Sequence, residues 1–233
     1  MAKLGKWALG ILMAAAIVLC FMYAPEATRP NFSVLDAAGK PTLQPWAAFR
    51  IFYFHVPAAW IAVLAFAVAM IQSIRVLRGT GQRADDLALA SSELGFLFCT
   101  VALVSGMIWA RLEWGAFWNW DPRQNTVLVL LLIYAGYFTL RSAVPEPHRR
   151  ARLAGVYSIL AFVTVPFLVF IVPRVMQTLH PSPIIQTSER SGSMNPRMLQ
   201  VFFLFLIGYT GLYAWMLQLK TAAIRLSRTR ITT

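Results

Sequence analysis

Three tryptophans lie within seven residues, in a short polar break between two long apolar runs. The break reads EWGAFWNWDPRQNT and contains Trp114, Trp118 and Trp120. Indole rings often sit at the headgroup level of membranes, but that role requires neither Gly115 between the rings nor Asp121 before a proline. Trp114 and Trp118 are four residues apart, so they share a face if the segment is helical. The pattern predicts an aromatic surface for a flat ligand.

Two histidines accompany this surface. His55 stands in YFHVPAAW, at the start of an apolar run, and His180 stands in RVMQTLHPSP, after another. Imidazole is the commonest metal ligand among side chains. No acidic cluster lies beside them, which disfavours a typical zinc or two-metal site. The third histidine, His148, lies in the basic stretch PEPHRRAR and is interpreted as a solvated loop residue.

Heme has the properties that these residues fit. It joins an apolar macrocycle to two anionic propionates, and its iron accepts imidazole axially. We therefore expect His55 and His180 to ligate iron from opposite faces while the indoles cover the ring. The predicted platform is Trp114, Gly115, Trp118, Trp120 and Asp121, with Asp121 fixing the loop by hydrogen bonding. Guanidinium matches carboxylate geometry, so the candidate propionate partners are Arg111, Arg123, Arg50 and Arg174.

The elements that position these residues are predicted to be membrane-spanning helices. Of the 233 residues, 58% are hydrophobic and only 13% are charged, about half the charged share of a soluble domain. Runs long enough to span occur at about 7–24, 54–76, 90–110, 126–142, 153–173 and 199–219. Backbone groups in lipid must be satisfied internally, so each run is expected to be a helix. We predict an all-α bundle of six helices in a single integral-membrane domain spanning residues 1–233, with the tryptophan segment at about 111–125.

The net charge of +12 is interpreted as a sign of topology, not of nucleic-acid binding, because the charges lie in the loops. Most of the 21 Lys and Arg residues fall on one side if both termini are cytoplasmic. This orientation puts the tryptophan segment, His55 and His180 on the outer face. The basic tail KTAAIRLSRTRITT is predicted to be a short interfacial helix, and the first span is interpreted as a retained anchor.

Several chemical classes are disfavoured by motifs that the sequence lacks. Cys20 and Cys99 form no C-x-x-C pair, so we expect two small buried residues and no thiolate site. The chain has no C-x-x-C-H for covalent heme attachment and no G-x-x-x-x-G-K-[ST], which excludes a self-contained ATP-driven pump.

The tryptophan segment resembles a known signature. WGAFWNWDPR is similar to the WGxxWxWD pattern of the tryptophan-rich WWD heme-handling proteins. YFHVPAAW resembles the start of the second helix in the CcmC family, the heme-handling membrane component of cytochrome c maturation system I. The chain length, the six spans and the placing of two histidines in the first and third outer segments resemble this family as well. WDPRQNT also resembles the system II proteins of the CcsA type, which have more helices and extra histidines.

The resemblance implies a role in cytochrome c-type biogenesis. It implies that heme b is a transient cargo, held at the periplasmic face of the bacterial inner membrane and delivered to the heme chaperone CcmE. The other implied partners are the ABC-type subunits CcmA and CcmB and the small protein CcmD. We expect no bond chemistry on this chain, so it has no catalytic residues and is not an enzyme. Nucleic acid is not an expected partner.

Three alternatives remain open at this point. A CcsA-like synthase component shares the WxWDP run. A membrane b-type cytochrome subunit holds heme permanently, usually between histidines inside its helices. A secondary transporter places polar groups at the midplane of broken helices, and mid-helix charges are nearly absent here, with Pro166 as the comparable irregularity.

Overall fold

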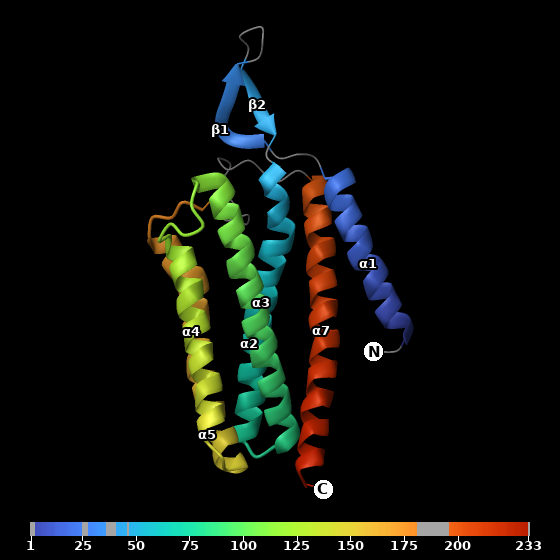
Figure 1. Ribbon diagram of the computed structural model, residues 1–233, viewed down its shortest axis with the longest axis vertical. Helices are drawn as coiled ribbons and strands as arrows, with labels where there is room; N and C mark the ends of the chain where they lie inside the picture. The colour runs from blue at the N-terminus through green and yellow to red at the C-terminus, as the bar shows by residue number, and fades with distance from the viewer. Residues whose placement is uncertain (1–2, 25–27, 36–40, 46, 181–195, 233) are drawn as a thin grey trace.

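The fold is a bundle of long helices, described by a computed structural model for residues 3–24, 28–35, 41–45, 47–180 and 196–232 (Figure 1). Six helices within these ranges are long and apolar enough to cross a membrane, which confirms the predicted class. The spans are α1 (Lys3–Met22), α2 (Phe52–Leu77) after the short η1 (Ala47–Ile51), α3 (Gln82–Trp114), α4 (Pro122–Ala143), α5 (Pro147–Pro166) and α7 (Pro196–Thr232). The fifth span continues from α5 through a π-helical turn, η2 (Phe167–Ile171), into α6 (Val172–Val175).

A small β-hairpin stands at one end of the bundle. Strand β1 (Thr28–Leu35) pairs antiparallel with β2 (Pro41–Pro45), with Leu35 opposite Pro41 and Thr28 opposite Pro45. It lies at the end where the chain passes from α3 to α4, and α7 ends at the opposite end of the bundle (Figure 1). The prediction of an all-α bundle did not include these two strands.

Small residues bring α2 close to its neighbours. Ala58, Ala62, Ala65 and Ala69 are buried and recur every three or four residues, so they form one face of the helix. Opposite them, Gly95 of α3 leaves room for the Phe66 ring, because an added Cβ would lie 2.5 Å from a ring carbon. In lipid, burial of apolar surface does little to favour helix association. Van der Waals contact between closely approaching helices therefore stabilises the bundle. Helix α2 packs against α3, α5 and α7, while α1 packs against α7.

Acidic residues placed before prolines start two of the spans. Asp121 caps α4 and accepts a hydrogen bond from the Arg123 amide, and Glu146 caps α5 by accepting from the amides of His148 and Arg149. Proline suits the next position because its missing N–H would be unpaired there anyway. The proline in DPR therefore marks the first turn of a helix.

The observed helices extend beyond the apolar runs. Helix α3 begins at Gln82, eight residues before the predicted span, and includes Asp85 and Asp86, both buried. Their charges are compensated, since Arg141 of α4 binds Asp85 through two contacts of 2.7 and 2.9 Å and Arg228 contacts both acids. Arg228 belongs to α7, so the predicted separate interfacial helix is wrong: the basic tail continues α7 to Thr232.

Candidate functional site

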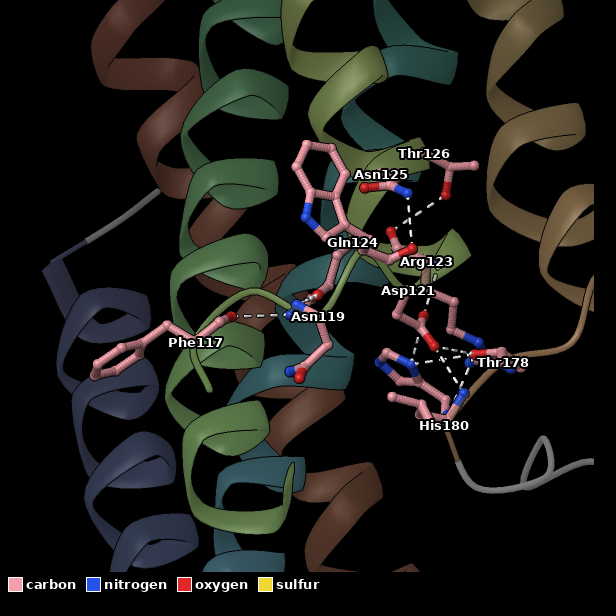
Figure 2. Close-up of polar contacts among 11 residues, drawn as sticks. Phe117, Asn119, Asp121, Arg123, Gln124, Asn125, Thr126, Thr178 and His180 are labelled. Carbon is pink, nitrogen blue, oxygen red and sulfur yellow. Dashed lines mark hydrogen bonds and ion pairs between the residues drawn. The ribbon is translucent and has the colours of Figure 1, made fainter. Parts of the chain in front are cut away.

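Asp121 joins two segments that are almost sixty residues apart in sequence. Its carboxylate is buried and accepts four hydrogen bonds. One oxygen accepts from the Arg123 amide and from His180 Nδ1, each at 2.9 Å. The other accepts from the Thr178 hydroxyl and the Leu179 amide, each at 2.7 Å. Figure 2 shows these bonds converging on one side chain. Asp121 forms the hydrogen bonds expected of it, and they fix the segment after α6 as well as its own loop.

The same contacts set the charges of the pair. Burial opposes ionisation of Asp121, but the hydrogen bonds from Thr178, Leu179 and Arg123 outweigh it and hold the pKa of this carboxyl below its usual range. Burial lowers the pKa of His180 to about 4, although the Asp121 carboxylate acts in the opposite direction. His180 is thus a neutral imidazole at pH 7. Because a carboxylate can only accept, Nδ1 carries the proton, and Nε2 keeps a free lone pair.

Two indoles flank His180. The Trp114 ring meets the imidazole edge-on, with ring centroids 5.0 Å apart, and Trp109 lies 5.8 Å away on a tilted plane. The two indoles also contact each other at 4.9 Å. Both come from the last turns of α3, so this helix end carries the aromatic wall beside the imidazole.

His55 is held in the same way, but by backbone. Its Nδ1 lies 2.8 Å from the Ala102 carbonyl and 3.1 Å from the Ser105 hydroxyl of α3. The Ser105 hydroxyl donates to the carbonyl of Val101, at 2.7 Å. A carbonyl oxygen has no proton to give, so His55 Nδ1 is the donor and its Nε2 is the unprotonated nitrogen. Gly106 makes room, because a Cβ there would lie 2.9 Å from His55 Cε1.

The two predicted ligands therefore share one chemical state. Each imidazole donates through Nδ1 to a fixed acceptor, and each is left with an unprotonated Nε2, the form that binds metal ions. Both histidines lie against the C-terminal part of α3, His55 at Ala102 and Ser105 and His180 at Trp109 and Trp114. The structure thus brings together residues from α2, α4 and the segment after α6.

The rest of the tryptophan segment forms a looped arm. Helix α3 ends at Trp114, and Gly115 adopts a left-handed conformation (φ 81°) as its cap. Trp118 is therefore not one helical turn beyond Trp114, and the two do not share a helix face. Trp118 packs edge-on against Trp120, with centroids 6.1 Å apart, and Trp120 is 77% exposed.

Gln124 holds this arm to the first turn of α4. Its side-chain oxygen accepts from the Asn119 amide at 2.9 Å, and its nitrogen donates to the Phe117 carbonyl at 3.0 Å. Asn125 donates to the Trp120 carbonyl at 2.9 Å. Figure 2 shows Gln124 reaching back to both backbone groups. The backbone of the arm is therefore fixed while the Trp120 indole remains open to an incoming molecule.

The four candidate arginines differ in their present partners. Arg123 is half-buried, and its buried Nε has no hydrogen-bond partner in the part of the chain that the structure describes. Arg111 donates to the Gly115 carbonyl, and Arg174 to the Phe170 carbonyl at 2.6 Å. Arg50, in η1, donates to the carbonyl of Cys20 in α1 at 3.4 Å. Of the four arginines, Arg123 is the one with a buried donor that lacks a hydrogen-bond partner among the described residues.

Comparison with known proteins shows the family of this chain. The family model described as heme exporter protein C matches residues 3–233. The chain belongs to the heme exporter protein C family. The heme exporter protein C of Bradyrhizobium diazoefficiens is 33% identical over 191 residues, covering 82% of this chain and 70% of that protein. The one from Escherichia coli K12 is 30% identical over 164 residues, covering 70% and 66%.

The predicted likeness to CcsA is also present, over a shorter length. The cytochrome c biogenesis protein CcsA of Parasynechococcus marenigrum is 38% identical over 93 residues, which cover 40% of this chain and 30% of that protein. Because the family match covers nearly the whole chain, this protein is a member of the heme exporter protein C group.

Within this member of the family, sequence reasoning missed several residues of the site. Trp109 lies five residues before Trp114, outside the segment chosen for its tryptophan density. Thr178 donates to Asp121 and accepts from the His180 amide at 3.2 Å, a local turn signal two residues before the histidine. Gly106 has no sequence signature, because its role depends on the His55 ring packing across from another helix.

Proposed function

We propose that this protein binds heme as a cargo through His55 and His180 and presents it at the outer membrane face for cytochrome c maturation. The observation that carries the proposal is the matched state of the two imidazoles. Each has Nδ1 donating to an acceptor, so Nε2 is the unprotonated nitrogen. Iron in heme accepts such nitrogens axially. Family membership supports heme as the cargo, since its relatives are named heme exporters.

The surroundings of the histidines fit the rest of a heme. Trp109 and Trp114 supply apolar surface next to His180. Arg123 supplies a half-buried cation whose buried Nε has no partner among the described residues, and leaving such a donor unpaired costs free energy. A propionate would satisfy it with a charge-assisted hydrogen bond. Arg123 is therefore our first choice among the four candidate propionate partners.

The location of the histidines favours delivery over permanent storage. His55 lies in the first turn of α2, and His180 lies beyond the end of α6. Both are at the end of the bundle, whereas a permanent b-type site usually lies between mid-helix histidines. The exposed Trp120 offers a surface that a second protein can reach. We assign delivery of heme b to CcmE, with CcmA, CcmB and CcmD as partners, no catalytic step on this chain, and both termini in the cytoplasm.

Absorption spectroscopy of the purified full-length protein tests the proposal. Heme should co-purify with a low-spin spectrum, His55→Ala or His180→Ala should change or remove that spectrum, and His148→Ala should leave it intact because His148 lies at the other end of the bundle. Adding heme-free CcmE should then withdraw the heme. Heme that is absent, or that is indifferent to both ligand substitutions, would refute the proposal, and heme that CcmE leaves in place would refute the delivery step.

A further inference from the structure

A basic cavity lies at the end of the bundle opposite the tryptophan segment. It has a volume of about 310 Å³ and is formed where α2 turns into α3. Four polar and two apolar residues line it: Gln72, Arg75, Thr80, Arg83, Ala84 and Leu87. Gly79 and Gly81 shape the turn, with φ of 83° and 84°, a conformation that glycine adopts without strain.

The arginines of this cavity are not neutralised by the protein. Within the described ranges, neither Arg75 nor Arg83 forms an ion pair, and the hydrogen bond recorded for the Arg75 side chain goes to the neutral Gln72, at 3.3 Å. The nearest acids in sequence, Asp85 and Asp86, are engaged by arginines of α4 and α7. Two cations therefore face one cavity without a counterion.

The cavity lies at the depth where a lipid headgroup begins. The second span ends at Leu77 and the third begins at Gln82, so the turn between them marks the boundary of the apolar region. Ile71 stands one helical turn before Arg75 on the same face of α2 and is 49% exposed. A basic cavity above an exposed apolar side chain matches a molecule with a phosphate at one end and acyl chains at the other.

We propose that this cavity binds the phosphate of an anionic lipid headgroup. Arg75 and Arg83 contact the phosphate, and Ile71 and the neighbouring face of α2 contact the acyl chain. The ligand chemistry is an anionic phosphodiester, which a free phosphate ion would share in part. This site is separate from the heme site, so it stands or falls independently of the proposed function.

Native mass spectrometry of the full chain in a neutral detergent tests this site. The probes are dioleoyl-phosphatidylglycerol, dioleoyl-phosphatidylcholine and inorganic phosphate. Each basic side chain near an anionic lipid contributes roughly a fivefold preference, so Arg75→Gln with Arg83→Gln should weaken phosphatidylglycerol retention about thirtyfold. Arg149→Gln with Arg152→Gln removes the same charge from the start of α5 and should change retention little. Thermal melting of each variant checks that it is folded.

Three outcomes would overturn the proposal. Equal losses in the two double variants would mean that net charge, not the cavity, holds the lipid. Equal retention of phosphatidylcholine would mean that the arginines do not select an anion. Displacement by millimolar inorganic phosphate would mean that the occupant is a free ion. If the cavity variant is poorly folded, Arg83→Gln alone serves in its place, with an expected loss of about fivefold.

Discussion

Replacing Gly106 by alanine should displace the His55 ring and weaken its binding to heme, although His55 itself is unchanged. An ideal Cβ on Gly106 would lie 2.9 Å from His55 Cε1 and 3.4 Å from Nδ1. Carbon atoms in contact are normally about 3.5–4.0 Å apart, so the ring must retreat by roughly 0.6 Å or more. The bond from Nδ1 to the Ala102 carbonyl is now 2.8 Å, and a retreat of that size takes it beyond ordinary hydrogen-bond length.

The expected loss is one of ligation, not of folding. Overpacking of this kind costs about 1–3 kcal/mol, which corresponds to roughly 5- to 150-fold weaker heme binding if the strain is relieved by moving His55. Alanine also favours a helix over glycine by about 1 kcal/mol, so the thermal stability of α3 should change little. The measurement is heme titration by absorbance in detergent, together with the low-spin signal of the bound iron.

Two control variants test whether the loss of heme binding acts through the His55 ring. Gly10→Ala on α1 places a methyl group in open space and should leave heme binding unchanged. His55→Ala removes the ring, so adding Gly106→Ala to that variant should cause no further loss, because the two changes act through one contact. Wild-type affinity in Gly106→Ala, or an equal loss with and without the His55 ring, would refute the reasoning.

Further predictions concern Asp121, His180, Gln124 and the ion pairs at the other end. Asp121→Asn turns one accepting oxygen into a donor, leaves two buried donors unpaired at about 1–3 kcal/mol each, and should weaken heme binding at least tenfold by the same titration. Because burial lowers the pKa of His180 from 6.5 to about 4, its contribution to site stability is complete above pH 6.5 and is lost as pH falls toward 4; ¹⁵N-histidine NMR of the heme-free protein should show a midpoint near 4, and a midpoint at 6.5 would contradict this. Gln124→Ala removes two hydrogen bonds to the arm, about 1 kcal/mol each, and should increase quenching of tryptophan fluorescence by a soluble quencher, whereas unchanged quenching would mean that the arm is held by other contacts. Asp85→Asn breaks a buried ion pair with Arg141 and should destabilise the fold by about 3–5 kcal/mol in thermal melts while leaving the heme spectrum unaltered.

The spans were predictable because lipid imposes one strong rule on sequence. Apolar runs located all six helices. The placing of His55, His180 and the tryptophan segment at one end of the bundle followed from the order of those runs. The ends of the helices were harder. Asp85 and Asp86 resemble loop residues until their partners on α4 and α7 are known, because a hydropathy window contains no information about ion pairs between distant helices.

The inner arrangement of the site was less predictable than its composition. Spacing alone favoured Trp114 and Trp118 on one face, but Gly115 ends the helix between them. A Cβ on Gly115 would meet open space, so its left-handed conformation is the reason for glycine. Trp109 contacts the His180 ring through tertiary packing between distant segments. Local sequence carries such information only where a cap or turn signals it, as at Asp121.

The ion pair between Asp85 and Arg228 has a consequence for biosynthesis. The two residues are 143 positions apart. At bacterial synthesis rates of about 5–20 residues per second, α3 waits roughly 7–30 seconds before the cation that completes its acidic end has been made. During that interval Asp85 can already pair with Arg141 of α4, whereas Asp86 must stay in water or be bound by another protein. The last span thus closes the acidic end of the bundle, because it brings Arg225 and Arg228 to Asp86.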